Sequence, residues 1–365
     1  MRNASARPYF PNLDGLRFFA FLFVFISHAT LFIWQGPAFL AQGDLGVSFF
    51  FVLSGFLITY LLLFEKETSG NAVKLSNFYA RRILRIWPVY FITLCVGILV
   101  AHFQLMHLPF STAFKLSAIP WYTGFIANFY LIKYPAVSVL VAVLWSISIE
   151  EQFYFVWPLI LMTIRKRFIP WFLCTLILIA TLFRLFHWQD YNTVAYSTFS
   201  AMSDLAIGAL SGFLMFYMPA LSGKVGRYCT KNKVLLLYGI FIVCLAIKMF
   251  SSLLIPHAFY PLYVALMPVV FGLLFVGIIF EQNYSVHSLF KVSRSKASTY
   301  LGKISYGLYA YHMIAITVVL YIFSLFRIEP DLAITLISFL TAIGLASLSY
   351  KYIEQKVLRL KNKLH

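Results

Sequence analysis

Residues 44–64 read DLGVSFFFVLSGFLITYLLLF, and this stretch decides the fold. After Asp44 no charged side chain follows until Glu65, which leaves a run of 20 uncharged, mostly apolar residues. A helix of about 20 such residues crosses the hydrocarbon core of a bilayer, which is roughly 30 Å thick. The stretch therefore predicts a membrane-spanning helix, because only helices and closed barrels satisfy their own backbone in lipid.

Nine further stretches of this kind divide the chain, so we predict an all-α polytopic membrane protein with about ten transmembrane helices. The composition agrees, since 61% of the 365 residues are hydrophobic and 11% are charged, against about 25% charged residues in soluble domains. No interval between the stretches is long enough for a soluble domain, so we expect a single membrane domain over residues 1–365. The predicted spans are residues 16–34, 44–64, 87–105, 145–164, 168–186, 199–218, 233–250, 259–280, 301–325 and 331–350.

Lysine and arginine are unevenly distributed between the predicted loops. Of the 29 basic residues, 23 fall on the side of the N-terminus, three on the other side and three within spans. Because cytoplasmic loops carry the excess of lysine and arginine, both termini are expected in the cytoplasm. A net charge of +17 would suggest nucleic acid binding in a soluble protein, but here it lies in short loops, so we expect no nucleic acid partner. No residues show metal-ligand spacing, and we expect no metal.

The segments outside the spans carry two distinctive patterns. Residues 74–86, KLSNFYARRILRI, are basic and amphipathic, which is typical of a helix at the membrane surface. Prolines and short apolar runs after residue 107 favour re-entrant or interfacial pieces that cover a site from outside. The expected segments are a cytoplasmic N-terminal segment 1–15, a basic interfacial loop 65–86, an outward loop 107–144 and a cytoplasmic tail 351–365.

Three ionisable residues lie at the first predicted span: Asp14 just before it, and Arg17 and His28 within it. Such groups are costly in lipid and mark functional sites. Arg17 and His28 project within about 20° of one helix face and stand about 16.5 Å apart along its axis. Because imidazole exchanges protons near neutral pH, the stripe predicts a catalytic role for His28 and Arg17. In the structural alternative, Asp14 pairs with Arg17 at the interface and His28 hydrogen-bonds a neighbouring helix.

A second histidine, His312, lies in the ninth predicted span within SYGLYAYH, residues 305–312. It stands eleven residues after the start of its span, and His28 stands twelve after the start of its own. We therefore expect the two imidazoles at similar depth, facing one cavity. His312 and Tyr309 are candidates for substrate binding, and equally for a structural histidine and a core aromatic.

Two adjacent carboxylates, Glu150 and Glu151, stand in the fourth predicted span. Ser148 followed by Glu151 has the spacing of a capping box, which would start the helix at the serine. Neighbouring carboxylates point about 100° apart on a helix and cannot both cap it. We therefore expect at least one of them to face the site, with a catalytic role.

An arginine cluster, Arg81, Arg82 and Arg85, precedes the third predicted span. It fits ordinary anchoring by positive charge in the cytoplasm. Guanidinium groups also offer planar forks of donors that suit phosphate, so the cluster predicts a phosphorylated cosubstrate bound from the cytoplasm. Arg184 and Asp204, near the outer ends of neighbouring spans, are expected to pair with each other.

Six motifs follow one another along the chain: LDGLRFFAFLFVFISH (13–28), FFFVLSGFLI (49–58), RRILRIWPVYF (81–91), WSISIEEQFYFVWPL (145–159), LGKISYGLYAYH (301–312) and YKYIE (350–354). In this order they resemble membrane acyltransferase family 3, bacterial enzymes that O-acetylate lipopolysaccharide, exopolysaccharide and related glycans. The chain stops at His365 without the SGNH-hydrolase-like domain that often follows, so it is similar to a stand-alone form. It also lacks the arginine often seen just before the aspartate that corresponds to Asp204.

The resemblance implies an O-acetyltransferase of the bacterial inner (cytoplasmic) membrane that uses acetyl-CoA. Arg17 and His28 would be its essential pair, and Arg82 and Arg85 would contact the nucleotide end of acetyl-CoA. The acceptor would be an envelope glycan or lipid-linked sugar, such as lipopolysaccharide O-antigen or exopolysaccharide. The oligomeric state stays open.

The resemblance also places Glu150 and Glu151 on the acceptor side. Further candidates for substrate binding are Asp14, Tyr309, His312 and Asp204. The rival function is a secondary transporter or flippase for a lipid-linked sugar that uses buried arginine, histidine and glutamate. A membrane scaffold without turnover is a third alternative. Against the transporter, the sequence contains no internal half-repeat.

Overall fold

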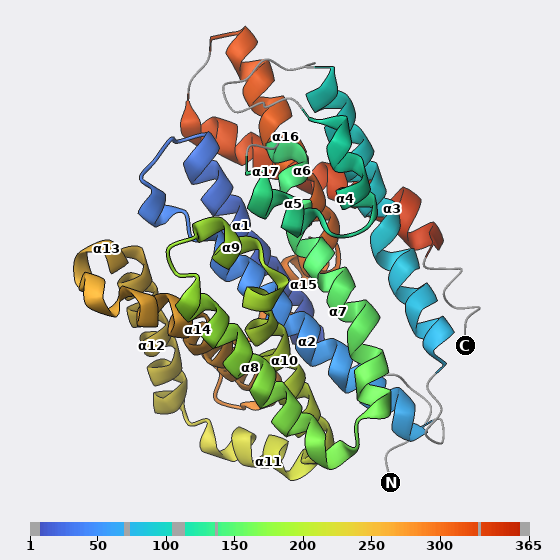
Figure 1. The fold of residues 1–365 in the computed structure, drawn as a ribbon, viewed down its shortest axis with the longest axis vertical. Coiled ribbons are helices and arrows are strands. Elements are labelled where there is room, and N and C mark those ends of the chain that lie inside the picture. Colours follow the sequence, from blue (N-terminus) through green and yellow to red (C-terminus); the bar gives the residue numbers. More distant parts are fainter. Residues whose placement is uncertain (1–7, 69–73, 104–113, 136–137, 328–329, 358–365) are drawn as a thin grey trace. The chain divides into compact units, whose positions relative to one another are not determined.

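The structure, a computed structural model, describes residues 8–68, 74–103, 114–135, 138–327 and 330–357 (Figure 1). Its regular elements within these ranges are all helical. Ten helices are long and apolar enough to cross a membrane, and each overlaps one predicted span. The all-α class and the ten spans are therefore confirmed, while the cytoplasmic position of the termini stays a prediction.

The long helices carry the spans, and shorter helices connect them. The long helices are α1 (Pro11–Phe32), α2 (Gly43–Thr68), α3 (Leu75–His102), α7 (Leu144–Thr163), α8 (Ile169–Phe186), α10 (Thr198–Tyr217), α12 (Lys231–Met249), α14 (Tyr260–Tyr284), α16 (Ser305–Leu325) and α17 (Asp331–Ser349). The shorter ones are α4 (Ile119–Thr123), α5 (Ala127–Lys133), α6 (Val139–Ala142), α9 (Tyr191–Tyr196), α11 (Pro219–Tyr228), α13 (Ser251–Leu254) and α15 (Lys296–Lys303). A π-helical turn, Tyr350–Glu354, follows α17.

The third span differs most from its prediction. Helix α3 begins at Leu75, twelve residues before the predicted start, so the basic stretch is the first part of a continuous helix. No glycine or proline interrupts residues 75–87, and arginine is a good helix former whose apolar stem packs while its charge reaches water. The described part of the expected interfacial loop 65–86 is largely helical, as parts of α2 and α3. Its position at the membrane interface stays a prediction, and residues 69–73 lie outside the described residues.

The other expected segments are partly described. Helix α1 already begins at Pro11 within the expected segment 1–15, of which residues 1–7 lie outside the described part. The described residues of the outward loop 107–144 form short helical pieces, and residues 107–113 lie outside. Residues 351–357 of the expected tail are helical, and residues 358–365 lie outside. Whether these pieces lie at a membrane surface stays a prediction.

Contacts between residues group the chain into two compact units. The first consists of Met1–Ala20, Leu45–Val73 and Phe153–Gly302. The second consists of Phe21–Asp44, Lys74–Gln152 and Lys303–His365. Helices α1 and α7 thus contribute residues to both units. The single domain expected over residues 1–365 stays a prediction.

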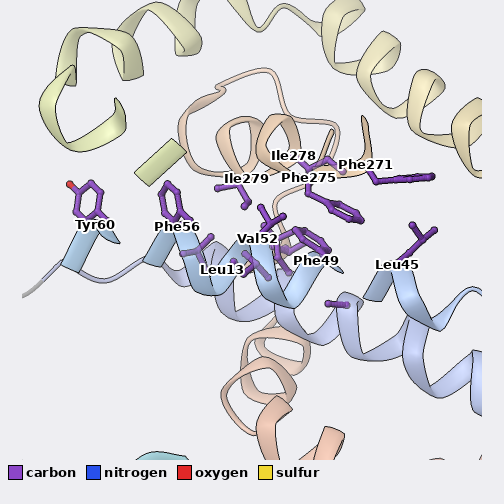
Figure 2. Packing of buried hydrophobic residues seen from close by; sticks show 14 of the residues in the cluster. Leu13, Leu45, Phe49, Val52, Phe56, Tyr60, Phe271, Phe275, Ile278 and Ile279 are labelled. Atoms are coloured by element: carbon purple, nitrogen blue, oxygen red, sulfur yellow. The ribbon is translucent and has the colours of Figure 1, made fainter. Parts of the chain in front are cut away.

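The core of the first unit is built from aromatic and aliphatic side chains of α1, α2 and α14 (Figure 2). The rings of Phe49 on α2 and Phe275 on α14 stack with their centroids 4.3 Å apart, and the buried Phe56 and Leu13 join the same cluster. Because lipid is as apolar as these side chains, close van der Waals packing holds such helices together. This packing sets the position of α1, which carries two candidate site residues in this unit.

Small residues allow α2 and α10 to approach closely in the first unit. A Cβ atom added at Gly55 would overlap the carbonyl oxygen of Leu205, and one added at Gly208 would overlap that of Val52. Such contacts between small residues are typical of membrane helix pairs. They bring the backbones of the two helices together beside Asp204.

In the second unit, α16 packs against α17 and α3. Gly307 of α16 faces Ala346 of α17, since an added Cβ would lie 3.3 Å from the alanine Cβ. Gly97 of α3 faces Val141 of α6 in the same way. The motif SYGLYAYH thus lies against neighbouring helices with its glycine at a close contact.

Candidate active site

Two histidines form a hydrogen-bonded pair in the second unit. His28 on α1 and His312 on α16 meet with Nδ1 of the first 2.9 Å from Nε2 of the second. His312 is completely buried, and its Nδ1 lies 2.6 Å from the carbonyl oxygen of Tyr309. The prediction that the imidazoles lie at similar depth is confirmed by this contact.

Aromatic rings surround the histidine pair. Phe21 meets His312 edge to face, with centroids 5.9 Å apart. Phe32 stacks on His28 at 6.0 Å, and Phe339 of α17 stacks on Phe21. Hydrogen bonds are electrostatically stronger in such apolar surroundings than in water, so the pair is held rigidly.

Tyr309 ties α16 to the start of α7. Its hydroxyl lies 2.7 Å from Ser146 Oγ and donates to the carbonyl oxygen of Val143 at 3.2 Å. These contacts support the core role that the sequence left open for Tyr309. Substrate binding by Tyr309 stays a prediction.

The start of α7 corrects the predicted capping box. The helix begins at Leu144, and Ser148 lies one turn inside it with its hydroxyl donating to the Leu144 carbonyl at 3.2 Å. A serine that bonds back to the carbonyl four residues earlier is not a cap. The helix starts earlier because uncharged residues lead into it directly from α6. The capping explanation for Glu151 is therefore wrong.

Glu151 is the carboxylate that faces α3. Its Oε2 accepts a hydrogen bond from Trp87 Nε1 at 3.0 Å, and Arg82 lies near enough to interact with it electrostatically. Its Oε1 is buried without a hydrogen-bond partner among the described residues. A buried acceptor left unpaired is costly, so this oxygen is suited to a donor group of a ligand. Glu150 lies close to Glu151 and is partly exposed.

Glu151 lies close to the part of α3 that carries the arginines, although the family resemblance places it on the acceptor side. The hydroxyl of Tyr306 donates to the Ile86 carbonyl of α3 at 2.9 Å, and Tyr306 also interacts with Glu151. His312 stands six residues further along α16, which is about 9 Å. Along the helices of this unit Glu151 therefore lies between Arg85 and the histidine pair. A role on the acceptor side stays a prediction for both glutamates.

The three arginines of α3 have different surroundings. Arg81 is buried, with 6% of its surface exposed. Arg82 is partly buried and lies over the Phe78 ring, 5.8 Å from its centroid. Arg85 is partly buried and interacts electrostatically with Glu354. Arg82 and Arg85 thus keep part of their surface for a ligand, as phosphate binding requires, and Arg81 keeps less.

Glu354 is a site candidate that the sequence reasoning missed. It lies in the π-helical turn after α17 and is 5% exposed. Its Oε1 has no hydrogen-bond partner among the described residues and lies 3.5 Å from the position of a Cβ at Gly307. Single π-helical turns are frequent at functional sites. A signal was present, because Glu354 is the acidic residue of the YKYIE motif.

Arg17 is held by a neighbour on its own helix. Its NH1 lies 3.1 Å from Asp14 Oδ1, and Tyr9 donates its hydroxyl to Asp14 Oδ2 at 2.7 Å. The ion pair of the structural alternative is therefore present. Arg17 and Asp14 belong to the first unit and His28 to the second, on the same helix α1. Their predicted roles in catalysis and substrate binding stay predictions.

Arg184 has a structural role in the first unit. It is 1% exposed and donates to the carbonyl oxygens of Ser200, at 2.6 Å, and Ala265, at 3.0 Å. Asp204 interacts with it electrostatically and accepts a hydrogen bond from Ser48 at 2.7 Å. The arginine thus joins α8 to α10 and α14. Substrate binding by Asp204 stays a prediction.

Comparison with known proteins identifies the family. A family model described as an acyltransferase domain matches residues 10–351. The peptidoglycan O-acetyltransferase OatA of Listeria monocytogenes is 28% identical over an alignment of 372 positions that covers 96% of this chain and 56% of that protein. The O-acetyltransferase OatA of Staphylococcus aureus is 30% identical over an alignment of 367 positions that covers 96% of this chain and 57% of that protein.

The chain spans little more than half the length of these curated relatives. No solved structure matches it significantly. The match of the acyltransferase model to nearly the whole chain, together with its ten apolar helices, shows a multi-pass membrane protein that belongs to acyltransferase family 3.

Proposed function

We propose that this protein transfers an acetyl or other short acyl group from cytoplasmic acyl-CoA to a hydroxyl of a cell-envelope carbohydrate. Family membership and the names of its relatives support O-acetylation. The single observation that carries the proposal is the hydrogen-bonded pair of the partly buried His28 and the completely buried His312, whose ring nitrogens are 2.9 Å apart. An imidazole held in this way is suited to act as a general base.

In the proposed reaction, His28 takes the proton of the acceptor hydroxyl as its oxygen attacks the thioester carbonyl. The new C–O bond forms, the C–S bond breaks, and the CoA thiolate leaves with a proton returned from the imidazole. General-base help of this kind contributes about 10²–10⁴ in rate. Correct positioning of both substrates contributes further.

The donor end of the site is proposed at α3. Arg82 and Arg85 bind the phosphates of the nucleotide through paired N–H donors, and the acyl arm extends along the helices of the second unit past Glu151 toward His28. The basic loops support a cytoplasmic position for this end. Arg17, which belongs to the first unit, is proposed to contribute charge stabilisation.

The proposed acceptor is an envelope glycan or a lipid-linked sugar, at the bacterial inner membrane. Lipopolysaccharide O-antigen and exopolysaccharide follow from the resemblance, and peptidoglycan is the acceptor in the name of the Listeria relative. These acceptors share a sugar hydroxyl, which is the group that the proposed base requires. Mass spectrometry of envelope glycans from cells with and without the protein will identify the acceptor by a mass change of one acyl group.

One assay separates the proposed enzyme from a transporter. Purified protein in liposomes is incubated with labelled acetyl-CoA and a glycan extract. We expect CoA release that depends on the glycan and on His28. Movement of the glycan across the bilayer without CoA release would overturn the proposal in favour of a transporter, and neither result would favour a scaffold.

A further inference from the structure

The donor and the acceptor can be assigned in each hydrogen bond of the histidine pair. The carbonyl oxygen of Tyr309 can only accept, so His312 Nδ1, 2.6 Å away, must carry the hydrogen. Among apolar rings an uncompensated charge is costly, so both imidazoles are neutral in the resting site. A neutral imidazole protonated on Nδ1 holds a lone pair on Nε2. His312 therefore presents an acceptor toward His28.

The acceptor on His312 determines which nitrogen of His28 is basic. His312 Nε2 lies 2.9 Å from His28 Nδ1, and a hydrogen bond there requires the hydrogen on His28 Nδ1. His28 Nε2 then keeps its lone pair. We infer that His312 is a positioning residue that holds His28 in this tautomer and orientation, so that Nε2 is the base. This inference rests on the proposed function of His28 and replaces direct substrate binding by His312.

The arrangement also stabilises the charge that forms during transfer. When His28 Nε2 takes the proton of the acceptor hydroxyl, the imidazole becomes positive and both its nitrogens are donors. The bond from its Nδ1 to the neutral His312 then becomes charge-assisted, and such bonds are about twice as strong as neutral ones. No proton passes to His312, just as the aspartate of a serine protease triad orients its histidine without taking its proton. The proton on His28 Nε2 later leaves with the thiolate.

Two substitutions of His312 separate positioning from structure. In His312→Gln the terminal amide reaches about as far as ring Nε2, so its oxygen can accept from His28. In His312→Asn the amide ends near the position of Nδ1 and can reach the Tyr309 carbonyl, but His28 loses its acceptor. We expect kcat to fall about 10- to 100-fold in His312→Asn, the usual effect of removing a partner that orients a reactive group, and much less in His312→Gln.

The kinetic constants distinguish a positioning residue from a substrate contact. If His312 acts through His28, KM for acyl-CoA and for the acceptor stays within about twofold in both variants, because no substrate contact is lost. A matched control is His187→Asn, since Nδ1 of His187 also lies within hydrogen-bond distance of a backbone carbonyl, that of Phe183 at 2.9 Å, but its side chain is exposed. Equal loss of kcat in the two His312 variants, or a rise in acceptor KM, would overturn the inference.

The tautomer is measurable without turnover. Nitrogen-15 solid-state NMR of histidine-labelled protein in bilayers reports which ring nitrogen carries hydrogen, and the signal lost in His28→Ala identifies His28. We expect hydrogen on Nδ1 of His28 in the wild type and in His312→Gln, and a mixture of tautomers in His312→Asn. Hydrogen on Nε2 of His28 in the wild type would refute the inference. Absence of acyl transfer by the wild type would refute the proposed function separately.

Discussion

Arg184 in the first unit and the pair of His28 and Glu151 in the second unit differ in how completely their polar atoms are bonded within the protein. Arg184 in the first unit directs its guanidinium donors to backbone carbonyls of two other helices. In the second unit, the bond between His28 and His312 uses Nδ1 of His28 and leaves Nε2 for a further partner, and Glu151 has an oxygen without a partner among the described residues. A polar group whose hydrogen bonds are all made within the protein is expected to have a structural role. A buried polar atom left without a partner is a candidate contact for substrate.

The largest expected effect is the loss of transfer in His28→Ala. The variant removes the proposed base and leaves the packing of α1 against α17 in place, so the rate falls about 10²–10⁴-fold. The wild type and variant are compared by CoA release in liposomes, and their folding by thermal unfolding in detergent. Full activity in a folded His28→Ala protein contradicts the proposed function.

Arg184→Leu is expected to lower the stability of the folded protein without a direct effect on the acyl-transfer reaction. It removes the guanidinium donor from the carbonyl oxygens of Ser200 and Ala265, and leaving a buried acceptor without its partner costs about 1–3 kcal/mol for each. The measurement is the thermal midpoint in detergent, with the exposed Arg165→Leu as the control. A folded Arg184→Leu protein that has lost only activity would contradict the structural role of Arg184.

The spans were predictable because lipid requires one feature that a sequence displays directly, a long uncharged run. The depth of His28 and His312 was predictable from the same counting, since a helix rises about 1.5 Å per residue. The start of α3 was missed because basic residues ended the apolar run while the backbone stayed helical. Charged residues thus predict where an apolar run ends, but they do not predict where the helix itself begins.

Side-chain partners were harder to predict than helices. The capping spacing of Ser148 and Glu151 matched a common local pattern, but α7 starts at Leu144 and the pattern has no role there. Glu354 belonged to a recognised motif, yet its burial depends on a π-helical turn, which adds a residue to the turn and redirects the side chain. Trp87, the partner of Glu151, is 64 residues away in sequence. Such contacts depend on packing between distant segments.

Glu151→Gln and Glu150→Gln test which carboxylate belongs to the site. A hydrogen bond to a charged group contributes about 1.5–3 kcal/mol, so loss of the Glu151 charge beside Trp87 is expected to lower kcat/KM about 10- to 100-fold. Glu150→Gln is expected to change it less than threefold. Combining Trp87→Phe with Glu151→Gln should cost less than the product of the single effects, because the two share one bond. Equal effects of the two glutamate variants would contradict this assignment.

The smallest expected effect concerns Asp190, an exposed residue between two spans whose bonds are local. Its Oδ1 accepts from the Thr193 amide at 3.1 Å and caps α9, and its Oδ2 accepts from the Thr193 hydroxyl at 2.6 Å. These hydrogen bonds hold the pKa of the Asp190 carboxyl below its ordinary value. The cap therefore stabilises the folded protein above the unfolded-state pKa, about 3.9, and its contribution is lost as pH falls through the lower folded-state pKa.

Asp190→Ala should accordingly reduce the stability of the protein by about 1 kcal/mol at pH 7, and the difference from wild type should shrink below about pH 4. Asp190→Asn keeps a capping oxygen, so it should lose less and show no such pH dependence. Thermal unfolding at pH 7 and pH 3 measures both variants. Because the bonds of Asp190 are satisfied within one turn of chain, neither variant should alter acyl transfer at pH 7. A loss of transfer there would mean that saturated bonding does not separate structural from functional polar groups in this protein.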